Sequence, residues 1–249
     1  MDHIERVTEE FERQADRFDI WAEKTDDQVA DRFRTALAKA GEGSVLDVAC
    51  GPGVVTAAIA PRAASVVAFD ATEQMLEKAR ARCAKAGLRN VQFGCGDAEN
   101  LPFEEAQFDG LITRLAVHHF ANPQRAFDEM FRVLRPHGIA VIVDVVSSED
   151  ADESNLQNAI ERLRDPSHVR MLPASELDAC VTAAVSASFS TRPGTNTANS
   201  KNGWESSTTL IVPNLSEQFF ERWQMPAAPR EWASRSKTAR SYSSIVGAY

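Results

Sequence analysis

The sequence predicts a doubly wound α/β fold, in which a mostly parallel sheet carries helices on both faces, and three observations predict it. Short apolar runs alternate with helix-like segments from about residue 28 to residue 184. The first run, Val45–Ala49, leads through Gly51-Pro-Gly53 into the helical segment Val54–Ala60, which is how such folds open. The strongest run, Ile139–Val146, is almost continuously apolar, as a strand covered on both faces requires.

Two helices are expected before the first strand. Residues 4–22 place apolar side chains on one face at helical spacing, and residues 28–40 do the same before Gly41. The simplest interpretation of the first helix is that its apolar face packs against the rest of the domain.

The elements after the glycine turn are delimited by apolar runs and by stop signals. Further strands are expected at Val66–Phe69, Val91–Phe93 and Gly110–Thr113. A helix capped by Thr72 follows the second strand and ends at Gly87. Another begins at Asn122-Pro123 and is stopped by Pro136-His-Gly138.

Two more helices are expected after the strongest strand. Residues 149–165 carry Leu156, Ile160 and Leu163 at helical spacing. These side chains are expected to pack on the domain or to cover a pocket. The second helix opens at Pro173, with Ser175 as its cap, and runs to Ala184.

Asp47 makes the glycine turn unsuitable for a phosphate group. Dinucleotide folds place a pyrophosphate over these glycines, and a carboxylate four residues before Gly51 would repel it. Position 56 is Thr, where the G-x-G-x-x-G pattern has Gly or Ala. A ligand with positive charge and no phosphate suits the turn better. S-adenosylmethionine, with its sulfonium and ammonium groups, fits that description.

The segment Asp47-Val-Ala-Cys-Gly51-Pro-Gly53 resembles motif I of the class I S-adenosylmethionine-dependent methyltransferases, D/E-x-G-x-G-x-G. Ala49 replaces the first glycine, which slightly narrows the room beside the amino-acid end of the donor. The resemblance runs from about Phe11 to Ala184 and is closest to the small-molecule enzymes of ubiquinone and menaquinone biosynthesis. It implies a Rossmann-like domain over residues 28–184, S-adenosyl-L-methionine as cofactor, and a helical lid over residues 1–27.

The resemblance and the spacing together assign the first donor contacts. The amino-acid end of the donor is expected to meet Asp47, Ala49, Gly51 and Gly53. Asp70 stands 23 positions after Asp47 at the end of a strand. A carboxylate there can accept hydrogen bonds from both ribose hydroxyls. The alternative is that Asp70 only caps the next helix.

Three further residues are assigned to the adenine ring by the resemblance. Met75 would lie against the ring, which suits a polarisable thioether, although a core methionine is the alternative. Asp97 would take the adenine amino group, and the backbone N–H of Ala98 would meet the ring. A solvated loop aspartate is the alternative for Asp97.

Two adjacent histidines, His118 and His119, follow the fourth strand. They have no third ligand nearby and cannot both face one ion from a regular element, so no metal site is predicted. One of them is expected to anchor the loop by a hydrogen bond. The other, His118, is expected to face the cleft, where it contacts the donor or acts as a base.

Residues 185–249 form an irregular C-terminal tail that does not fit the expected fold. Two antiparallel strands should complete the sheet, yet 14 of the 24 residues from Ser186 to Thr209 are Ser, Thr or Asn. Ser216–Gln224 is its one amphipathic helix. One hypothesis is a shift of reading frame near Val185, and a natural low-complexity insertion is the alternative. Read from the third base of the Gly194 codon, the code permits DKHREFEEW, a segment typical of the resembled enzymes. A stop codon or polar nonsense in the other forward frames of the gene would refute the shift.

Charge and composition exclude several classes of partner. A net charge of −9 argues against a nucleic-acid partner. The four cysteines show neither metal nor disulfide spacing and indicate reduced thiols in a cytoplasmic protein. The N-terminus lacks a signal peptide, and no apolar run approaches the roughly 18 residues that span a bilayer, so no integral membrane association is expected.

The sequence therefore predicts methyl transfer to a small acceptor that is apolar or quinone- or phenol-like. Two alternatives remain open. A nicotinamide-dependent oxidoreductase would use the same topology, but Asp47 and Thr56 count against it. The other alternative is a donor-binding protein without productive catalysis. The sequence leaves the oligomeric state open.

Overall fold

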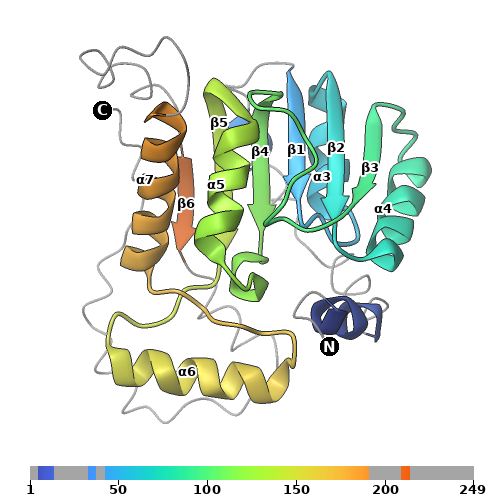
Figure 1. The fold of residues 1–249 in the computed structure, drawn as a ribbon. Coiled ribbons are helices and arrows are strands. Elements are labelled where there is room, and N and C mark those ends of the chain that lie inside the picture. The colour runs from blue at the N-terminus through green and yellow to red at the C-terminus, as the bar shows by residue number, and fades with distance from the viewer. Residues whose placement is uncertain (1–4, 14–32, 38–42, 191–208, 214–249) are drawn as a thin grey trace.

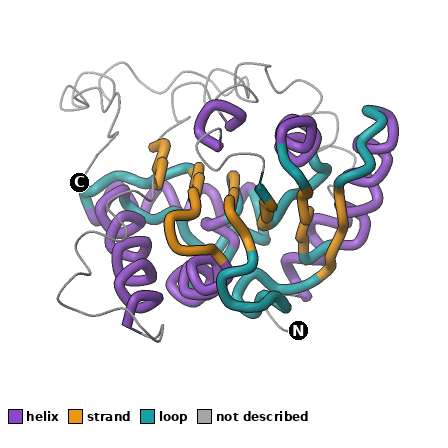
Figure 2. Tube along the Cα trace, turned by 90° about the horizontal axis from the view of Figure 1, so that it is seen from above, coloured by secondary structure: helices purple, strands orange, loops and turns teal. Residues whose placement is uncertain are grey.

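The computed structural model describes residues 5–13, 33–37, 43–190 and 209–213. Within them the chain forms a six-stranded sheet in the order β3-β2-β1-β4-β5-β6. Each neighbouring pair of strands is parallel. Helices lie on both faces of the sheet (Figures 1 and 2). This arrangement confirms the predicted doubly wound α/β class.

The bounds of the elements follow the predicted alternation closely. The strands are β1 (Ser44–Val48), β2 (Ser65–Asp70), β3 (Val91–Cys95), β4 (Phe108–Arg114), β5 (Leu134–Asp144) and β6 (Thr209–Pro213). The α-helices are α3 (Val54–Ile59), α4 (Glu73–Lys85), α5 (Pro123–Val133), α6 (Ala151–Arg164) and α7 (Ala174–Ser190). Two 3₁₀ turns, η2 (Ala60–Arg62) and η3 (Val117–His119), lie between them. Residues 5–13 and 33–37 are also helical, and the rest of the two helices expected before β1 lies outside the described residues.

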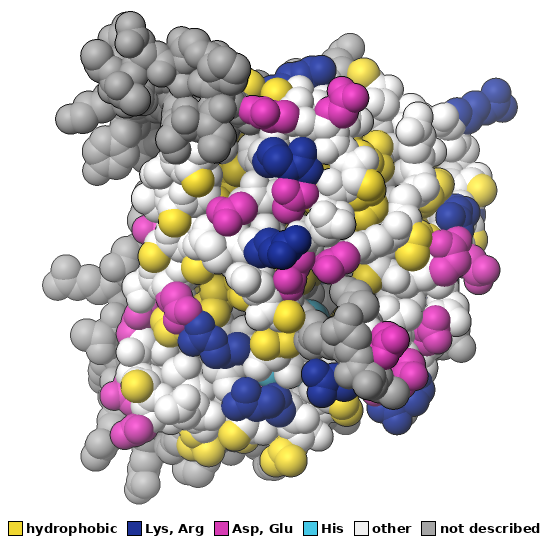
Figure 3. Space-filling model, in the orientation of Figure 1, with side chains coloured by type: hydrophobic (Ala, Val, Ile, Leu, Met, Phe, Trp, Pro, Cys, Tyr) yellow, Lys and Arg dark blue, Asp and Glu magenta, His cyan; other side chains and the backbone are white. Residues whose placement is uncertain are grey.

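The face of the molecule in Figure 3 intersperses basic and acidic side chains instead of gathering one sign into a patch. Among the described residues, no helix combines the length and the apolar character needed to cross a membrane. In the same residues, no group of three or more His, Cys, Asp or Glu side chains is arranged to hold a metal ion.

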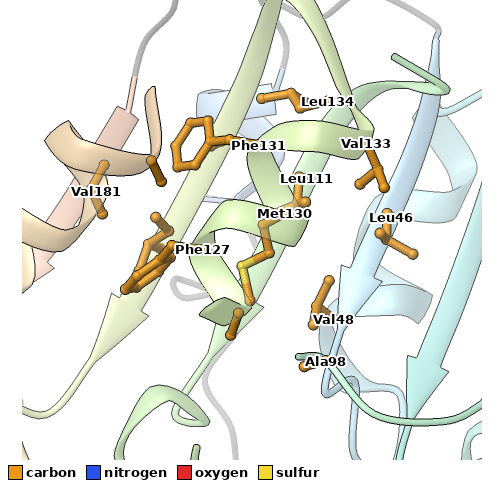
Figure 4. Close-up of a cluster of buried hydrophobic side chains, with 14 of the residues drawn as sticks. Leu46, Val48, Ala98, Leu111, Phe127, Met130, Phe131, Val133, Leu134 and Val181 are labelled. Carbon is orange, nitrogen blue, oxygen red and sulfur yellow. The ribbon is translucent and has the colours of Figure 1, made fainter. Parts of the chain in front are cut away.

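The two largest clusters of the core lie on opposite faces of the sheet, and a smaller third cluster contains Cys50, Ala68 and Leu76. On one face, Phe127, Met130 and Phe131 of α5 pack against Leu111 of β4 and Val181 of α7 (Figure 4). The other face is covered by α3 and by residues 33–37. The members of that second cluster that come from helices include Phe33, Leu37, Val55 and Ile59. Because both faces are apolar, polar side chains of the strands are confined to their ends.

Two of the predicted helix starts and stops are confirmed. The side chain of Asn122 caps α5 by accepting from the Arg125 N–H at 3.1 Å, and Pro123 is the first helical residue. Gly87, with φ +70°, follows the end of α4.

Of two other predicted caps, Thr72 has the predicted position without the capping bond, and Ser175 is wrong. Thr72 stands at the N-cap of α4 but makes no side-chain capping hydrogen bond. Ser175 lies inside α7, where its Oγ donates to Glu149 Oε2 at 2.5 Å. In both cases a contact with another part of the chain replaces the expected cap. The Thr72 N–H is bonded by Asp70, and the Ser175 hydroxyl is bonded to Glu149.

The junction between α5 and β5 also differs from the prediction. The helix ends at Val133, and β5 already includes Leu134, Pro136 and Gly138. Leu134 pairs with Phe108, and the register shifts between Phe108 and Gly110 to absorb the extra residues. Apolar spacing alone could not separate a last helical turn from this irregular strand start.

The C-terminal part of the sheet differs most from expectation. α7 continues to Ser190, past Ala184, where the helix was expected to end. In place of two antiparallel strands, the described residues after α7 form one strand, β6, which pairs in parallel with β5. The expected helix Ser216–Gln224 and most of the segment in the reading-frame hypothesis lie outside the described residues.

Candidate functional site

The carboxyl ends of β1, β2 and β3 meet at one edge of the sheet, which faces α6 and residues 5–13 in Figure 1. The register pairs Asp47 with Ala68 and Asp70 with Cys95. The Gly96 N–H donates to the Asp70 carbonyl at 3.0 Å and so ties the segment that carries Asp97 to β2. Asp47, Asp70 and Asp97 therefore belong to the same rim, although the first two side chains are turned inward.

Asp47 is buried, with 2% of its surface exposed. Its Oδ2 accepts a hydrogen bond from Thr56 Oγ1 at 2.5 Å. Burial raises the pKa of Asp47 to about 7. The hydrogen bond from Thr56 lowers this pKa, and the nearby Asp70 carboxylate raises it further. Thr56, which the sequence marked only as a departure from a dinucleotide motif, is thus the partner that satisfies a buried carboxyl group.

The turn after β1 contains three left-handed residues. Ala49, Gly51 and Gly53 have φ values of +54°, +53° and +76°. For Ala49 this conformation costs roughly 1–2 kcal/mol, because its Cβ crowds the following carbonyl. Ala49 therefore replaces the first glycine of the motif at a position whose backbone conformation favours glycine.

The two glycines of the turn have different surroundings. A Cβ added to Gly53 would lie 2.7 Å from the Cβ of Ala79 in α4. A Cβ added to Gly51 would meet nothing within 4 Å. Gly53 is needed so that α3 and α4 can pack, while the space that a Cβ of Gly51 would occupy is empty.

Asp70 shapes the same turn from the neighbouring strand. Its Oδ2 accepts from the Gly51 N–H at 2.8 Å, and its Oδ1 accepts from the Thr72 N–H at 2.9 Å. Burial raises the pKa of Asp70, although both backbone hydrogen bonds oppose the shift. The carboxylate thus holds the glycine turn and the start of α4 together, as the alternative interpretation partly anticipated. Its contact with a ribose stays a prediction.

The residues assigned to the adenine lie beside this turn. Met75 is buried in the first turn of α4, and Ala98 is buried in the loop after β3. Asp97 is half-buried, and its Oδ1 accepts from the Glu99 N–H at 2.8 Å. Adenine contacts for these residues stay predictions.

His118 lies after β4 and is bonded to a residue that the sequence analysis missed. Its Nδ1 is 2.5 Å from Oδ1 of Asp144, the last residue of β5. The other oxygen, Oδ2, accepts from the N–H groups of Ala116 and Val117 at 3.0 and 2.5 Å. An acidic residue that closes a strand was the signal used for Asp70, and it could have identified Asp144.

His119 makes the loop-anchoring hydrogen bond that was expected of one of the two histidines. Its Nδ1 lies 3.1 Å from both the carbonyl oxygen and Oγ of Ser167. Its ring also meets the edge of Phe11, with 4.9 Å between ring centroids. His119 therefore connects the helix of residues 5–13, part of the predicted lid, to the loop after α6.

His168 is a third histidine beside this pair. Its Nε2 lies 2.9 Å from Asn158 Oδ1, and its ring centroid is 5.6 Å from that of His118. Burial lowers the pKa of His119 to about 3 and that of His168 to about 4, and the nearby His118 acts in the same direction. Burial would also lower the pKa of His118, but the Asp144 carboxylate outweighs it and raises this pKa above its usual value. Of the three, only His118 therefore has its pKa shifted upward, toward the charged form.

The packing predicted for α6 is wrong. Leu163 is 89% exposed, and Leu156 and Ile160 are about half exposed. The inward face is polar instead, because Asn158 bonds the backbone N–H and carbonyl of Met171. Ser154 also faces inward, and its Oγ donates to Ser147 Oγ at 2.8 Å. The loops on either side of α6 use these polar contacts, so the apolar stripe is left on the outer side.

The rim favours a cationic ligand without phosphate groups. Asp47 and Asp70 lie beneath the turn at which Gly51 leaves open space. Ionised carboxylates at this place attract a sulfonium or ammonium group and repel a pyrophosphate. The residues present therefore fit the expected methyl donor better than a dinucleotide.

Comparisons with known proteins agree with this chemistry. The family model "Methyltransferase domain" matches residues 45–138. The uncharacterized methyltransferase YcgJ of Bacillus subtilis is 39% identical over 61% of this chain. Its crystal structure superimposes with a TM-score of 0.61 at 34% identity, covering 64% of this chain and 68% of that one.

Two other proteins are similar. A candidate methyltransferase from Bacillus halodurans C-125 has a structure that superimposes with a TM-score of 0.61 at 37% identity. The match covers 62% of this chain and 67% of that one. A demethylmenaquinone methyltransferase of Clavibacter sepedonicus is 40% identical over 45% of this chain. The chain spans 59% of the length of the curated Bacillus subtilis relative and 44% of that of the Clavibacter one.

Proposed function

Because this chain belongs to the S-adenosylmethionine-dependent methyltransferases of class I, we propose that it transfers a methyl group from S-adenosyl-L-methionine to a small acceptor. The observation that carries the proposal is the meeting of Asp47 and Asp70 beneath the open glycine turn. These carboxyl groups, with Ala49, Gly51 and Gly53, would hold the amino-acid end and the ribose of the donor. Met75, Asp97 and Ala98 would hold the adenine.

The chemistry that the donor supplies is a methyl group on a sulfonium, which is attacked in line by a nucleophile of the acceptor. The residues of this chain contribute mainly alignment and the exclusion of water. Residues 5–13 and α6 both lie at the carboxyl edge of the sheet, where a covering element would act (Figure 1).

We propose an acceptor that is apolar or quinone- or phenol-like. The likeness to a demethylmenaquinone methyltransferase supports this choice. Nucleic acid is a poor partner for a chain of net charge −9. The four cysteines are free, as suits a reduced, cytoplasmic setting.

The first test is donor-induced stabilisation. S-adenosylhomocysteine at about a hundred times its Kd should stabilise the protein by about 2.7 kcal/mol, which is about 5–10 °C in Tm for a chain of this size. NAD and NADP should produce no shift. A shift with NAD alone would overturn the donor assignment in favour of an oxidoreductase.

The second test is transfer itself. The protein is incubated with a methyl-labelled donor and a small-molecule extract, and labelled products are separated by mass spectrometry. A labelled small molecule supports the proposal. Donor-induced stabilisation with no labelled product in any extract would instead identify a donor-binding protein without catalysis.

A further inference from the structure

We infer that the carboxyl ends of β4 and β5 form an acceptor site for a phenol or enol hydroxyl, in which His118 Nε2 takes the hydroxyl proton and Asp144 holds the imidazole ring. The inference rests on the proposed function and names the acceptor class. His118 would be a catalytic residue, because it touches the reacting oxygen, and Asp144 a positioning residue.

The hydrogen bond to Asp144 decides which nitrogen of His118 is available. Asp144 Oδ1 lies 2.5 Å from Nδ1, so neutral His118 keeps its proton on Nδ1 and carries its lone pair on Nε2. Asp144 cannot easily turn away, because Oδ2 is held by two backbone N–H groups and the residue is 3% exposed. The orientation of the ring is therefore fixed by a buried, fully bonded carboxylate.

The other nitrogen is free to meet a ligand. Nε2 makes no hydrogen bond within the part of the chain that the structure describes. In that same part, the one buried side-chain polar atom without a partner is Thr113 Oγ1, so Nε2 is open to solvent. The side chain of His118 is 14% exposed. A substrate hydroxyl could replace solvent at this atom.

The backbone of His118 is held as firmly as its ring. Its carbonyl oxygen accepts from the N–H groups of Val169 and Arg170 at 2.9 and 3.1 Å. These bonds attach η3 to the loop after α6. Since β4 is the direct neighbour of β1, this site adjoins the strand that carries the glycine turn.

The groups around His118 let it gain a proton. His119 and His168 face it as neutral rings, because burial keeps both pKa values far below 7. Asp144 of β5, together with Asp165 and Glu161 at the end of α6, favours the imidazolium form. The base is therefore surrounded by groups that stabilise its protonated product.

The strength of the base selects the acceptor. A neutral imidazole whose Nε2 is left as the base by the Nδ1–Asp144 bond takes the proton of a phenol, whose pKa is about 10, far more readily than that of an aliphatic alcohol. In the step, the O–H bond breaks and its proton goes to Nε2. The oxygen electron pair forms the C–O bond with the methyl carbon, and the C–S electron pair stays on the sulfur of the donor. The proton then leaves His118 for water.

The first test needs no substrate. In ¹⁵N NMR of the imidazole groups, neutral His118 should carry its proton on Nδ1 and should titrate above pH 6.5. Asp144→Asn should lower that pKa and mix the two tautomers. A neutral His118 protonated on Nε2, or a titration that Asp144→Asn leaves unchanged, would overturn the inference even if His118 variants fail to fold.

The second test measures labelled methyl transfer to phenol and 4-methylphenol, which ionise at about pH 10, with an aliphatic alcohol and an aniline as comparison acceptors. For wild type the rate should rise with pH through the His118 pKa. His118→Asn should lower it about 10²–10⁴-fold and remove that limb, with the S-adenosylhomocysteine shift unchanged. His137→Asn is the matched control, because His137 is exposed and asparagine tolerates its φ of +65°.

The outcomes separate the inference from the proposed function. Loss of the S-adenosylhomocysteine shift in wild type would contradict the donor assignment itself. Donor binding with methylation of phenols that His118→Asn leaves intact would overturn only the role of His118. Methylation of the aniline or the alcohol, with none of the phenols, would overturn the acceptor class.

Discussion

Thr56 and Thr113 are two buried hydroxyl groups on neighbouring parts of the core, and they differ in one respect. Thr56 Oγ1 donates to the Asp47 carboxyl group. Thr113 Oγ1, on β4, has no hydrogen-bond partner in the described part of the chain. Both residues are fully buried. Comparing substitutions at the two positions therefore measures how much one buried hydrogen bond contributes to the free energy of unfolding.

We expect Thr56→Val to destabilise the fold by about 1–3 kcal/mol, because it leaves a buried carboxyl group without its donor. The loss should be larger at pH 8 than at pH 5.5, since Asp47 ionises with a pKa of about 7. Thr113→Val, which removes an unbonded hydroxyl of the same shape, should be neutral or stabilise by up to about 1 kcal/mol. Urea unfolding at both pH values measures each change, and equal losses for the two variants would contradict this reading of the hydrogen bonds.

At this scale the sequence predicts residues that act through a local pattern. Asp47, Gly51 and Gly53 come from one heptapeptide, and Asp70 from its place at the end of a strand. Asp144 also closes a strand and could have been found in the same way, although its bond to His118, 26 positions away, could not. His168 fits no such pattern, because its importance lies in a bond to Asn158, 10 positions away. Such bonds exist only after the sheet and α6 are in place.

The two glycines of the turn between β1 and α3 have different structural roles. Gly53 permits the close packing of α3 on α4, and Gly51 leaves open space next to Asp70. The same residue type thus permits close packing at one position and leaves the space beside the backbone empty at the other.

We expect Gly53→Ala to destabilise the fold by about 2–5 kcal/mol, because the new Cβ would clash with Ala79 and the backbone is left-handed. Gly51→Ala should cost only about 1–2 kcal/mol of stability, since its Cβ meets nothing. It should nevertheless weaken S-adenosylhomocysteine binding at least about tenfold, by filling the space beside the donor. Urea unfolding and calorimetric titration of the two variants check this. A Gly51→Ala protein with wild-type affinity would show that the donor does not approach this residue.

Elements with a strong apolar period were predicted well, and the failures have local physical causes. Five strands of the sheet and the helices α3 to α5 follow from their patterns. β6 was missed because a five-residue edge strand after a polar stretch has no period to detect. The face of α6 was predicted wrongly because two residues that look like solvent residues face inward. Asn158 bonds the backbone of Met171, and Ser154 bonds the side chain of Ser147.

For the molecule as a whole, the carboxyl edge of the sheet links stability to pH. Asp47 has a folded pKa of about 7, raised from about 3.8, so the folded protein binds more protons than the unfolded chain between these values. The stability that Asp47 contributes is complete below pH 4 and is lost as pH rises through 7. The slope reaches about 1.4 kcal/mol per pH unit within this window.

A cationic donor should reverse this dependence. Because a positive ligand favours the ionised form of Asp47, binding near pH 7 should release a fraction of a proton. Calorimetric titration with S-adenosylmethionine in buffers of different ionisation enthalpy measures the release. It should vanish in Asp47→Asn and above about pH 9, and a release that persists in that variant would place the titrating group elsewhere.

The fold class and the family could be predicted for the whole molecule because they depend on the order of strands and on one motif. The contacts of the histidine cluster could not, since the cluster brings together the ends of β4 and β5, residues 5–13 and the loop after α6. These segments are far apart in the sequence, and the pattern that identifies each segment does not show which other segments it contacts.

The two hydrogen bonds of Asp70 have a consequence for the speed and strength of ligand capture. They fix the Gly51 and Thr72 backbone before any ligand arrives, so little conformational entropy remains to be lost on association. Binding at this turn should therefore require no slow folding of the turn around the ligand, and the association rate should be limited mainly by diffusion and orientation.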